Sequence, residues 1–295
     1  MPKKPLPPCV PYNDLDLTRW KELDEVWTDS LWSIPRRDHA GGHRLSYHGN
    51  FVPQVATQTI LRFSREKEIV LDLFLGSGTT AREALRRNRR CIGVELKPEL
   101  AESVGAEFAD KPDQVRVLVG DSSSPGVEAA VRGVLSEWGS EAADLVVMHP
   151  PYAGIIRFSE LPECLSNASG PEAFLERWRE VVRRAWSLLK PDRFAILVIG
   201  DCYEKGELIP LGFDCMRVAN EEGFRTKSIV VKNIEGNEVG KGKAANLWRY
   251  RALRGGFYVF KHEYVIVLQK FEKAGARRRS TSSSSSEDAP PHTAQ

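Results

Sequence analysis

The sequence predicts an α/β fold, in which helices cover both faces of a doubly wound, seven-stranded and mostly parallel sheet with an antiparallel edge strand. Short runs rich in Val, Ile and Leu alternate with segments of helical character, which is typical of a parallel sheet with helical crossovers. The last two apolar runs are placed as the strands of a hairpin would be. With 295 residues and 41% hydrophobic composition, the chain can bury one large core.

The apolar runs and the residues between them give the elements in order. Strands are expected at 69–74, 90–96, 115–120, 144–149, 194–200, 225–232 and 263–270. Helices are expected at 53–65, 79–88, 97–108, 125–138, 171–189 and 211–221. Lys190-Pro191-Asp192 provides a stop for the fifth helix, because proline cannot continue the hydrogen-bond ladder of a helix.

Composition excludes several classes of protein. The five cysteines include no C-x-x-C pair, so we expect neither a metal site nor a disulfide framework. An apolar leader and a long apolar run are both missing, which favours a cytoplasmic protein. The formal net charge is only +2, so a nucleic-acid partner has to show itself as a local excess of Lys and Arg. Residues 1–11 and 273–295 have little to bury and are expected to be disordered tails.

A glycine-containing loop follows the first predicted strand. Gly76 and Gly78 let the backbone pass close under a ligand, and the helix that begins at Thr79 and Thr80 offers unpaired N–H groups. Taken alone, a G-x-G segment is also compatible with an ordinary tight turn, because position 81 is Ala and not the third glycine of the dinucleotide fingerprint.

Two acidic residues end the next two strands. Glu95 lies 19 positions after Gly76, where a carboxylate can accept both hydroxyls of a ribose. Asp121 follows the third strand at the same edge of the sheet, where ligands of open α/β sheets collect. A helix N-cap is the structural alternative for Asp121. Together with the glycine loop, the two acids predict a nucleoside-binding site.

The fourth predicted strand ends in His149-Pro150-Pro151-Tyr152. The two prolines fix two φ angles and remove two donors, so the carbonyls of His149 and Pro150 form a rigid acceptor site. An amine conjugated into a base needs such acceptors to localise its lone pair toward an electrophilic methyl group. Tyr152 adds a flat face on which a base rotated out of a duplex can stack. A proline-stiffened strand exit with a core tyrosine is the structural alternative.

In these two loops the chain resembles the DNA amino-methyltransferase family, whose members methylate N4 of cytosine or N6 of adenine. The segment from Phe74 to Gly78 resembles the family's cofactor loop, and residues 149–152 resemble its (Asp/Asn/Ser)-Pro-Pro-(Tyr/Phe) catalytic loop. Tyr47 to Gln54 resembles the segment before the cofactor loop. The resemblance spans residues 45–270 and implies a Rossmann-like class I methyltransferase fold, with a catalytic domain at 48–272 after an N-terminal arm or helical segment at 12–47.

The resemblance also implies S-adenosylmethionine as the cofactor and roles for individual residues. Asp72 is expected near its amino-acid moiety, Glu95 at the ribose and Asp121 at the adenine. Phe74 is expected beside the adenosine or the target base, and Asp201 is a secondary candidate near the base. The full set of implied cofactor residues is Asn50, Phe51, Pro53, Gln54, Asp72, Phe74, Gly76, Gly78, Thr79, Thr80, Glu95 and Asp121.

The chain departs from the family pattern in two ways. Position 149 is His, which accepts a hydrogen bond only when it is neutral. Activity is therefore expected to fall below about pH 6.5, the ordinary pKa of histidine. A neutral His is closer to the Ser of cytosine enzymes than to Asp, which favours cytosine N4 over adenine N6. In addition, the cofactor loop precedes the catalytic loop, whereas many enzymes with Ser-Pro-Pro-Tyr have the reverse order, so both bases stay open.

A basic stretch between Arg225 and Lys261 is the expected DNA contact. It holds nine Lys or Arg against two Glu and mixes glycines with aromatic residues, as a phosphate-tracking loop would. We expect an insertion at about 233–258 there, although a charge run can also be a solvated face. The expected DNA-binding residues are Arg157, Lys232, Lys241, Lys243, Arg249, Arg251 and Arg254.

Two further segments are candidates for contact with DNA. Ile155 to Phe158, directly after the catalytic loop, is placed to support a flipped base. Trp20, Trp27 and Trp32 of the arm either clamp DNA, fold over the cofactor or pack a core.

Other functions fit the sequence less well. A C5-cytosine methyltransferase needs a Pro-Cys pair after the fourth strand, and the one Pro-Cys pair here is Pro8-Cys9. A dehydrogenase would not explain the Pro-Pro-Tyr loop. RNA or protein-glutamine amino-methylation, and a non-catalytic nucleic-acid-binding protein, stay open. A DNA-modifying enzyme would act on DNA in the cytoplasm, and a restriction endonuclease counterpart is a possible partner.

Overall fold

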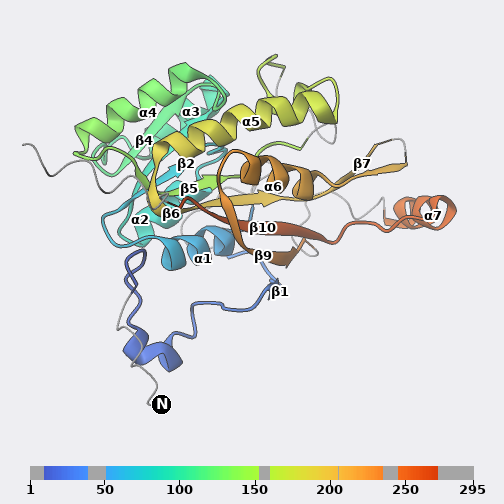
Figure 1. Ribbon diagram of the computed structural model, residues 1–295, viewed down its shortest axis with the longest axis horizontal. Helices are drawn as coiled ribbons and strands as arrows, with labels where there is room; N and C mark the ends of the chain where they lie inside the picture. The colour runs from blue at the N-terminus through green and yellow to red at the C-terminus, as the bar shows by residue number, and fades with distance from the viewer. Residues whose placement is uncertain (1–9, 39–50, 153–159, 205, 235–244, 272–295) are drawn as a thin grey trace, which may run out of the picture.

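The computed structural model describes residues 10–38, 51–152, 160–204, 206–234 and 245–271. Its centre is a mixed eight-stranded sheet with the order β1-β9-β10-β6-β5-β2-β3-β4 (Figure 1). The strands are β1 (Leu31–Trp32), β2 (Ile69–Asp72), β3 (Arg90–Glu95), β4 (Val115–Val119), β5 (Ala143–Met148), β6 (Leu189–Ile199), β9 (Arg225–Asn233) and β10 (His262–Gln269). β10 pairs antiparallel with both β6 and β9, and the other pairs in this sheet are parallel.

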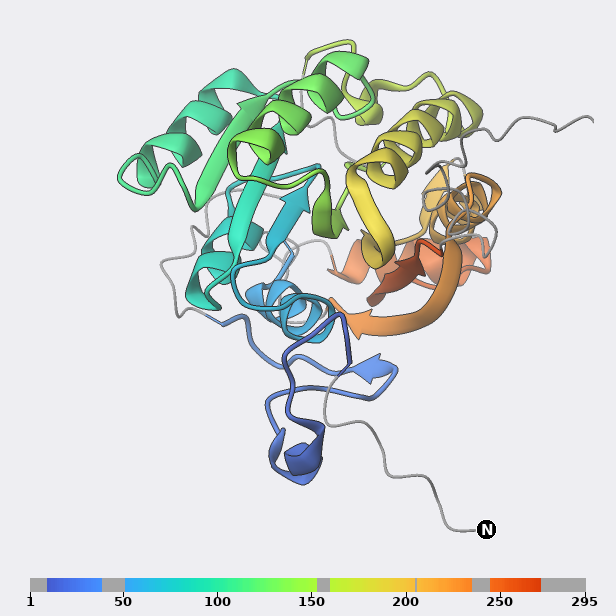
Figure 2. The ribbon, with the colours of Figure 1, turned by 60° about the vertical axis from the view of Figure 1, so that its left-hand side comes forward.

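Helices pack on both faces of the sheet, as expected (Figures 1 and 2). They are α1 (Pro53–Phe63), α2 (Thr79–Arg86), α3 (Pro98–Glu107), α4 (Pro125–Glu137), α5 (Pro171–Leu188) and α6 (Leu211–Glu221), with α7 (Ala245–Gly255) at the periphery. Proline stands in the first turn of α1, α3, α4 and α5, where its missing N–H costs no hydrogen bond. α5 ends at Leu188, just before Lys190-Pro191-Asp192, as the sequence predicts.

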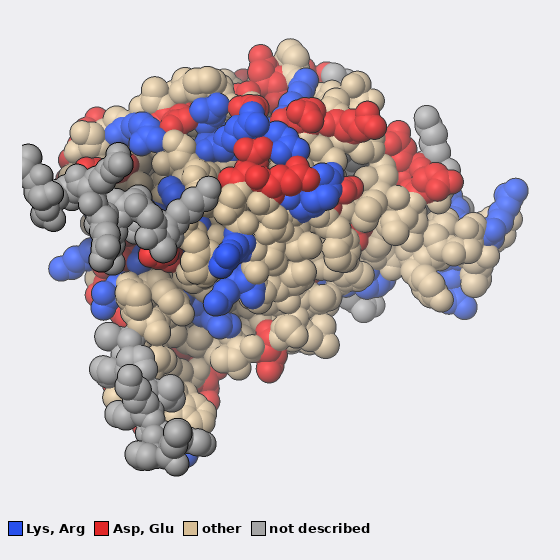
Figure 3. Space-filling model, viewed as in Figure 1, with Lys and Arg blue, Asp and Glu red and all other residues tan. Residues whose placement is uncertain are grey.

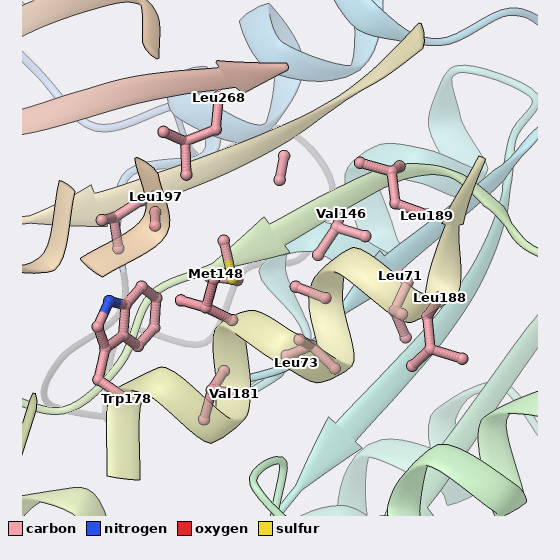
Figure 4. Packing of buried hydrophobic residues seen from close by; sticks show 14 of the residues in the cluster. Leu71, Leu73, Val146, Met148, Trp178, Val181, Leu188, Leu189, Leu197 and Leu268 are labelled. Carbon is pink, nitrogen blue, oxygen red and sulfur yellow. The ribbon is translucent and has the colours of Figure 1, made fainter. Parts of the chain in front are cut away.

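The core consists of two hydrophobic layers on opposite faces of the sheet. Strand β6 shows the alternation that creates them: Ala195 and Leu197 pack into one layer, Phe194 and Ile196 into the other, since successive side chains of a strand point to opposite faces. The first layer lies under α4, α5 and α6, and Figure 4 shows Trp178 of α5 packed toward this face of the sheet. The second lies under α1, α2 and α3.

The observed sheet differs from the expected one at the margin. All seven expected strands are present, but β10, the antiparallel strand, lies between β6 and β9 and is not at the edge. The eighth strand, β1, has only two residues and pairs with Val231 and Lys232. Such a short strand has no apolar periodicity of its own, so its position depends on tertiary packing. The hairpin of β7 (Cys202–Glu204) and β8 (Glu207–Ile209) and helix α7, inside the expected insertion, were also not expected.

The N-terminal arm packs on the second layer and contains little helix. Its described part, residues 10–38, has one 3-10 helix, η1 (Leu17–Glu22), and β1. Trp27 and Trp32 meet edge to face with ring centroids 5.3 Å apart, whereas Trp20 is 61% exposed. Core packing is therefore the outcome for two of the three arm tryptophans. The expected tails, apart from residues 10 and 11, lie outside the described residues.

The described residues offer no sign of a membrane-spanning helix, of a metal-binding group or of a disulfide. None of their helices is long and apolar enough to cross a membrane. No group of three or more His, Cys, Asp or Glu side chains in this part of the chain has an arrangement that could hold a metal ion. Cys91, Cys164, Cys202 and Cys215 are all buried free thiols.

Candidate functional site

The glycine loop leaves the carboxyl end of β2 and enters α2. Gly76 has φ 55° and Gly78 has φ 86°, values in the left-handed region that glycine adopts without steric cost. A Cβ on Gly78 would also lie 2.8 Å from Cγ1 of Val104 in α3. The left-handed φ of Gly76 favours glycine there, and Gly78 is required by both its backbone path and its close approach to α3.

The start of α2 fits an anionic ligand group. No side chain caps this helix at Gly78, so N–H groups of its first turn keep their hydrogens for a ligand. The Thr79 hydroxyl is buried without a hydrogen-bond partner in the described part of the chain. The Thr80 hydroxyl also lacks a partner of ordinary geometry, although it lies near enough to Asp72 to affect its ionisation. These donors suit the carboxylate of an amino-acid moiety.

Asp72 ends β2 below the loop and is 1% exposed. Its Oδ1 accepts a hydrogen bond of 2.8 Å from the N–H of Phe74. Burial raises the pKa of Asp72 to about 6, and the nearby Glu95 adds to the rise while the Thr80 hydroxyl and the Phe74 N–H oppose it. A carboxylate that is costly to ionise in the free protein gains from a cationic partner, such as a ligand ammonium group.

Glu95 joins the ends of β2 and β3. Its Oε2 accepts from the N–H of Gly76 and its Oε1 from the N–H of Lys97, each at 2.9 Å. Burial raises the pKa of Glu95, and these N–H groups oppose the rise. Each carboxylate oxygen can accept a second hydrogen bond, so the geometry fits a pair of ribose hydroxyls.

Asp121 follows β4 and is not the cap of α4. That role belongs to Ser124, whose side chain accepts from the N–H of Val127. Asp121 instead accepts from the N–H and the hydroxyl of Ser123, at 2.9 and 2.6 Å. These bonds fix its carboxylate at the same edge of the sheet as Glu95 and leave one acceptor site on each oxygen.

The Pro-Pro-Tyr loop lies beside the glycine loop. It leaves β5, which pairs in parallel with β2 so that Val147 is opposite Asp72. The N–H of Leu73 donates to the carbonyl of Val147 at 3.0 Å. The two expected loops therefore emerge from neighbouring strands at the same edge of the sheet, although they are about 70 residues apart in sequence.

The His149 imidazole lies between two aromatic rings. Its centroid is 5.3 Å from that of Phe51, just before α1, and 6.0 Å from that of Tyr152. Burial lowers the pKa of His149, the Lys232 ammonium lowers it further, and the Glu263 carboxylate opposes both. A neutral imidazole at pH 7 follows, which is the form that accepts a hydrogen bond.

Tyr152 is anchored by residues from β9 and β10. Its hydroxyl donates to Oε2 of Glu263 at 3.1 Å, and Nζ of Lys232 donates to Oε1 of Glu263 at 2.6 Å. Because Lys232 is 2% exposed and paired, its assignment to a DNA-binding surface is wrong. Burial alone would raise the pKa of Glu263, but the Lys232 ammonium and the Tyr152 hydroxyl hold it below its ordinary value.

The segment that follows β6 contributes a backbone contact to Tyr152 and a carboxylate with a structural role. A Cβ on Gly200 would lie 3.5 Å from the ring of Tyr152, so the ring lies against the backbone at the end of β6. Asp201 accepts from the N–H of Gly212 and from the hydroxyl of Tyr264, both at 2.9 Å. Its carboxylate therefore ties α6 and β10 together behind the site.

The remaining expected cofactor residues are distributed around this edge. Phe51 and Pro53 are buried, and Phe74 is partly buried against the core. Gln54 bonds the arm through its side-chain amide, donating to the carbonyl of Arg36 at 2.7 Å and accepting from the N–H of Asp38 at 3.1 Å. The candidates that lie outside the described residues are Asn50, Arg157, Lys241, Lys243 and the segment 155–158.

The basic insertion contains α7, which projects from the body of the molecule (Figure 1). Arg249, Arg251 and Arg254 are exposed on it, and Figure 3 shows cationic side chains at this end. The chain returning from α7 packs on the β7 hairpin, where the Tyr203 ring lies 4.8 Å from Phe257 and 4.9 Å from Phe260. These aromatic contacts attach the cationic helix to the edge of the sheet that carries the site.

Comparisons with known proteins find similarity to DNA methyltransferases in part of the chain. A family model described as DNA methylase matches residues 9–106. The orphan methyltransferase M.BamHII of Bacillus amyloliquefaciens is 36% identical over 81 residues, 25% of this chain and 29% of that protein. The type II methyltransferase M.MjaI of Methanocaldococcus jannaschii is 33% identical over 91 residues, 29% of each chain. Residues 9–106 of the chain are therefore similar to DNA methylases.

These likenesses have a limited extent. The chain spans less than a third of the length of the curated relatives it matches, and the matched family segment ends before the Pro-Pro-Tyr loop. A solved TehB-like S-adenosylmethionine-dependent methyltransferase from Corynebacterium glutamicum has 14% identity and a TM-score of 0.45, covering 86% of this chain and 95% of that chain. The activity, substrate and partners of the whole protein are therefore matters of proposal.

Glu263 is the residue of the site that the sequence did not reveal. It stands at the start of a predicted strand, where an acid has no special meaning, and its partner Lys232 was counted among the surface cations. The register of β9 against β10 pairs the two residues directly. If the register of these two strands had been known from the sequence, a Lys paired with a Glu at their ends would have indicated an ion pair beside the site.

Proposed function

We propose that this chain is a site-specific DNA methyltransferase that uses S-adenosylmethionine to modify an exocyclic amino group of a flipped base. The observation that supports this is the parallel pairing of β2 with β5, with Val147 opposite Asp72. It puts the cofactor loop and the His149-Pro150-Pro151-Tyr152 acceptor loop side by side at one edge of the sheet. Transfer of a methyl group to an amine requires this proximity.

The glycine-loop side of the site would hold the cofactor. The Asp72 carboxylate would face its ammonium group, and the first turn of α2 with the Thr79 and Thr80 hydroxyls would receive its carboxylate. Glu95 would accept from the ribose hydroxyls, Asp121 from the adenine amine, and Phe74 would pack beside the adenosine. When bound, S-adenosylmethionine supplies an electrophilic methyl group on a sulfonium.

The other side would hold the target amine. The flipped base would stack on Tyr152, while the His149 imidazole and the Pro150 carbonyl accept hydrogen bonds from the amine. This draws the lone pair of the nitrogen out of conjugation and toward the methyl group. As the new N–C bond forms and the methyl group leaves its sulfonium sulfur, which becomes a neutral thioether, the His149 nitrogen would take the proton that the amine loses.

The proposal also covers the target base and the contacts with DNA. A neutral His149 at the head of the loop favours cytosine N4 over adenine N6, because it has no negative charge, like the Ser of cytosine enzymes. Arg249, Arg251 and Arg254 of α7 would contact phosphates. Arg157, Lys241 and Lys243 are proposed to extend this contact. The enzyme would act on DNA in the cytoplasm, in some settings beside a restriction endonuclease.

Transfer of labelled methyl groups tests the proposal. DNA, RNA and protein are offered in parallel with radiolabelled S-adenosylmethionine, and nucleosides from the DNA are then analysed by mass spectrometry. We expect label in DNA as N4-methylcytosine. N6-methyladenine would overturn the base preference alone. Label only in RNA or protein would overturn the DNA substrate, and DNA binding without label in any acceptor would indicate a non-catalytic protein.

Two substitutions in the acceptor loop test the assigned roles. Tyr152→Ala and Pro150→Ala should each reduce methyl transfer by more than about a hundredfold, because base stacking and the rigid carbonyl are lost. Binding of S-adenosylmethionine, measured by calorimetry, should stay within about threefold of the unmodified protein. A matched loss of transfer and cofactor binding would contradict the division of the site into two sides.

A further inference from the structure

A buried ion pair lies directly behind the acceptor loop. Lys232 and Glu263 are opposite each other in the antiparallel ladder of β9 and β10, so their side chains emerge on the same face of the sheet. The side chains are 2% and 12% exposed, and Nζ lies 2.6 Å from Oε1. The second oxygen of Glu263 accepts the hydroxyl hydrogen of Tyr152 at 3.1 Å.

A buried ion pair is weak evidence for a stabilising role. Taking two charges out of water costs several kcal/mol per ion, and hydrophobic residues of similar volume often stabilise a protein as well or better. The neighbouring positions of both strands follow that rule, since Val230 and Val265 are buried in the apolar layer. A charged pair at this point therefore calls for a role beyond holding β9 to β10.

We infer that Glu263 and Lys232 are positioning residues of the acceptor loop, which hold the Tyr152 ring through its hydroxyl and maintain the charge balance around His149. The inference rests on the proposed function, because it assumes that Tyr152 receives the base and His149 the amine. Neither Glu263 nor Lys232 has to touch the substrate for this role.

Three contacts fix the ring of Tyr152. Its hydroxyl is held by Glu263, one side lies against the backbone of Gly200, and it meets the His149 ring in a T-shaped arrangement. Without the hydroxyl contact the ring can swing about its χ1 bond. Lys232 acts one step further away, because it holds the carboxylate that holds the hydroxyl.

The pair also balances the charges that His149 meets. The surroundings of its ring comprise Glu263 from β10, Lys232 from β9, Tyr152 from its own loop and Phe51 from the segment before α1. Glu263 raises the pKa of His149 and Lys232 lowers it. Removal of either charge alone should therefore shift the titration of His149, and the two shifts should have opposite signs.

The decisive experiment is a double-mutant cycle read by NMR and by kinetics. The variants are Glu263→Gln, which keeps an oxygen for the Tyr152 hydroxyl, Lys232→Met, and the two combined. The imidazole of His149 is titrated in protein carrying labelled histidine, with His149→Gln to assign its signal. Lys190→Met is the control, because Lys190 pairs with Asp144 at the opposite end of the sheet.

We expect the titration of His149 to move to lower pH in Glu263→Gln and to higher pH in Lys232→Met, and to return toward the original value in the double variant. The acid limb of the kcat profile should move in the same directions. The kcat of Tyr152→Phe, which lacks only the hydroxyl, should fall by up to about tenfold, with binding of S-adenosylmethionine unchanged. The control should move neither titration nor kcat.

An unchanged titration of His149 in both single variants, or an undiminished kcat in Tyr152→Phe, would overturn the inference. Should Lys232→Met fail to fold, Glu263→Gln and Tyr152→Phe decide the matter alone. The NMR titration needs no substrate, which separates the two proposals. Shifts of opposite sign in a protein that does not methylate DNA would refute the proposed function and leave the charge balance supported.

Discussion

At the scale of single residues, the histidine that heads the acceptor loop changes how the loop can work. The family's usual Asp, Asn or Ser presents an oxygen, whereas His149 presents one ring nitrogen and does so only when neutral. Burial and Lys232 lower the pKa of His149, so the structure favours the competent form. The carboxylate that this loop lacks is present behind it, on Glu263.

Asp72 leads to a prediction about pH. Burial raises the pKa of Asp72 to about 6 in the folded protein from an ordinary value of 3.8. Because the pKa of Asp72 is higher in the folded than in the unfolded protein, the protonated carboxyl favours the folded state at low pH. This contribution to stability is lost as the pH rises through the folded pKa. The loss amounts to up to about 3 kcal/mol between about pH 4 and pH 7.

Asp72→Asn should remove this pH dependence, because the amide does not ionise but still accepts from Phe74. Urea unfolding of both proteins between about pH 4 and pH 7 measures it. Relative to Asp72→Asn, the unmodified protein should lose stability as pH rises. If the free energies of unfolding of the two proteins changed with pH in the same way, Asp72 would not be costly to ionise. Added S-adenosylmethionine should reduce the difference at high pH, since its ammonium would pair with the carboxylate.

At the scale of elements, the sequence predicted the helices and strands with periodic apolar patterns. It missed the features that depend on pairing with a distant strand. Strand β5 and helix α5 have apolar patterns long enough to be recognised, and both lie where expected. Two-residue β1 has no pattern and exists because β9 pairs with it. Charge counting placed Lys232 on the surface, because the pairing of β9 with β10 is not visible in composition.

Helix α7 provides the prediction at this scale. Arg249 and Arg254 are exposed, and the helix itself contains no acidic residue, so its own sequence is positively charged and attracts a polyanion. Arg249→Gln combined with Arg254→Gln should weaken DNA binding about equally for all sequences and reduce the slope of log K against log salt by about 2. Fluorescence anisotropy at several salt concentrations measures both.

A matched pair of arginines controls for total charge. Arg183 of α5 and Arg217 of α6 are about half exposed and are bonded to nearby glutamates. Arg183→Gln combined with Arg217→Gln removes the same charge but should leave the salt slope unchanged. A slope that falls equally in both double variants would mean that net charge, and not α7, attracts DNA.

At the scale of the whole molecule, the N-terminal arm completes the sheet and reaches the site. Asn13 donates to the carbonyl of Arg62 at 2.9 Å, and Arg89 pairs with Asp14 at 2.9 Å. Further along, the Asn233 side chain accepts from the N–H of Ile34 at 2.7 Å. Asn233 directly follows Lys232 in β9. The arm therefore packs against both α1 and the strand that positions the acceptor loop.

If the arm is integral to the fold, loss of its packing should lower the stability of the whole molecule in one transition. Trp32 is 5% exposed and Trp20 is 61% exposed. Trp32→Ala should reduce the free energy of unfolding by about 3–5 kcal/mol, and Trp20→Ala by less than about 0.5 kcal/mol. Urea unfolding followed by far-ultraviolet circular dichroism measures both. An unchanged midpoint for Trp32→Ala would show instead that the arm contributes nothing to the stability of the sheet it pairs with.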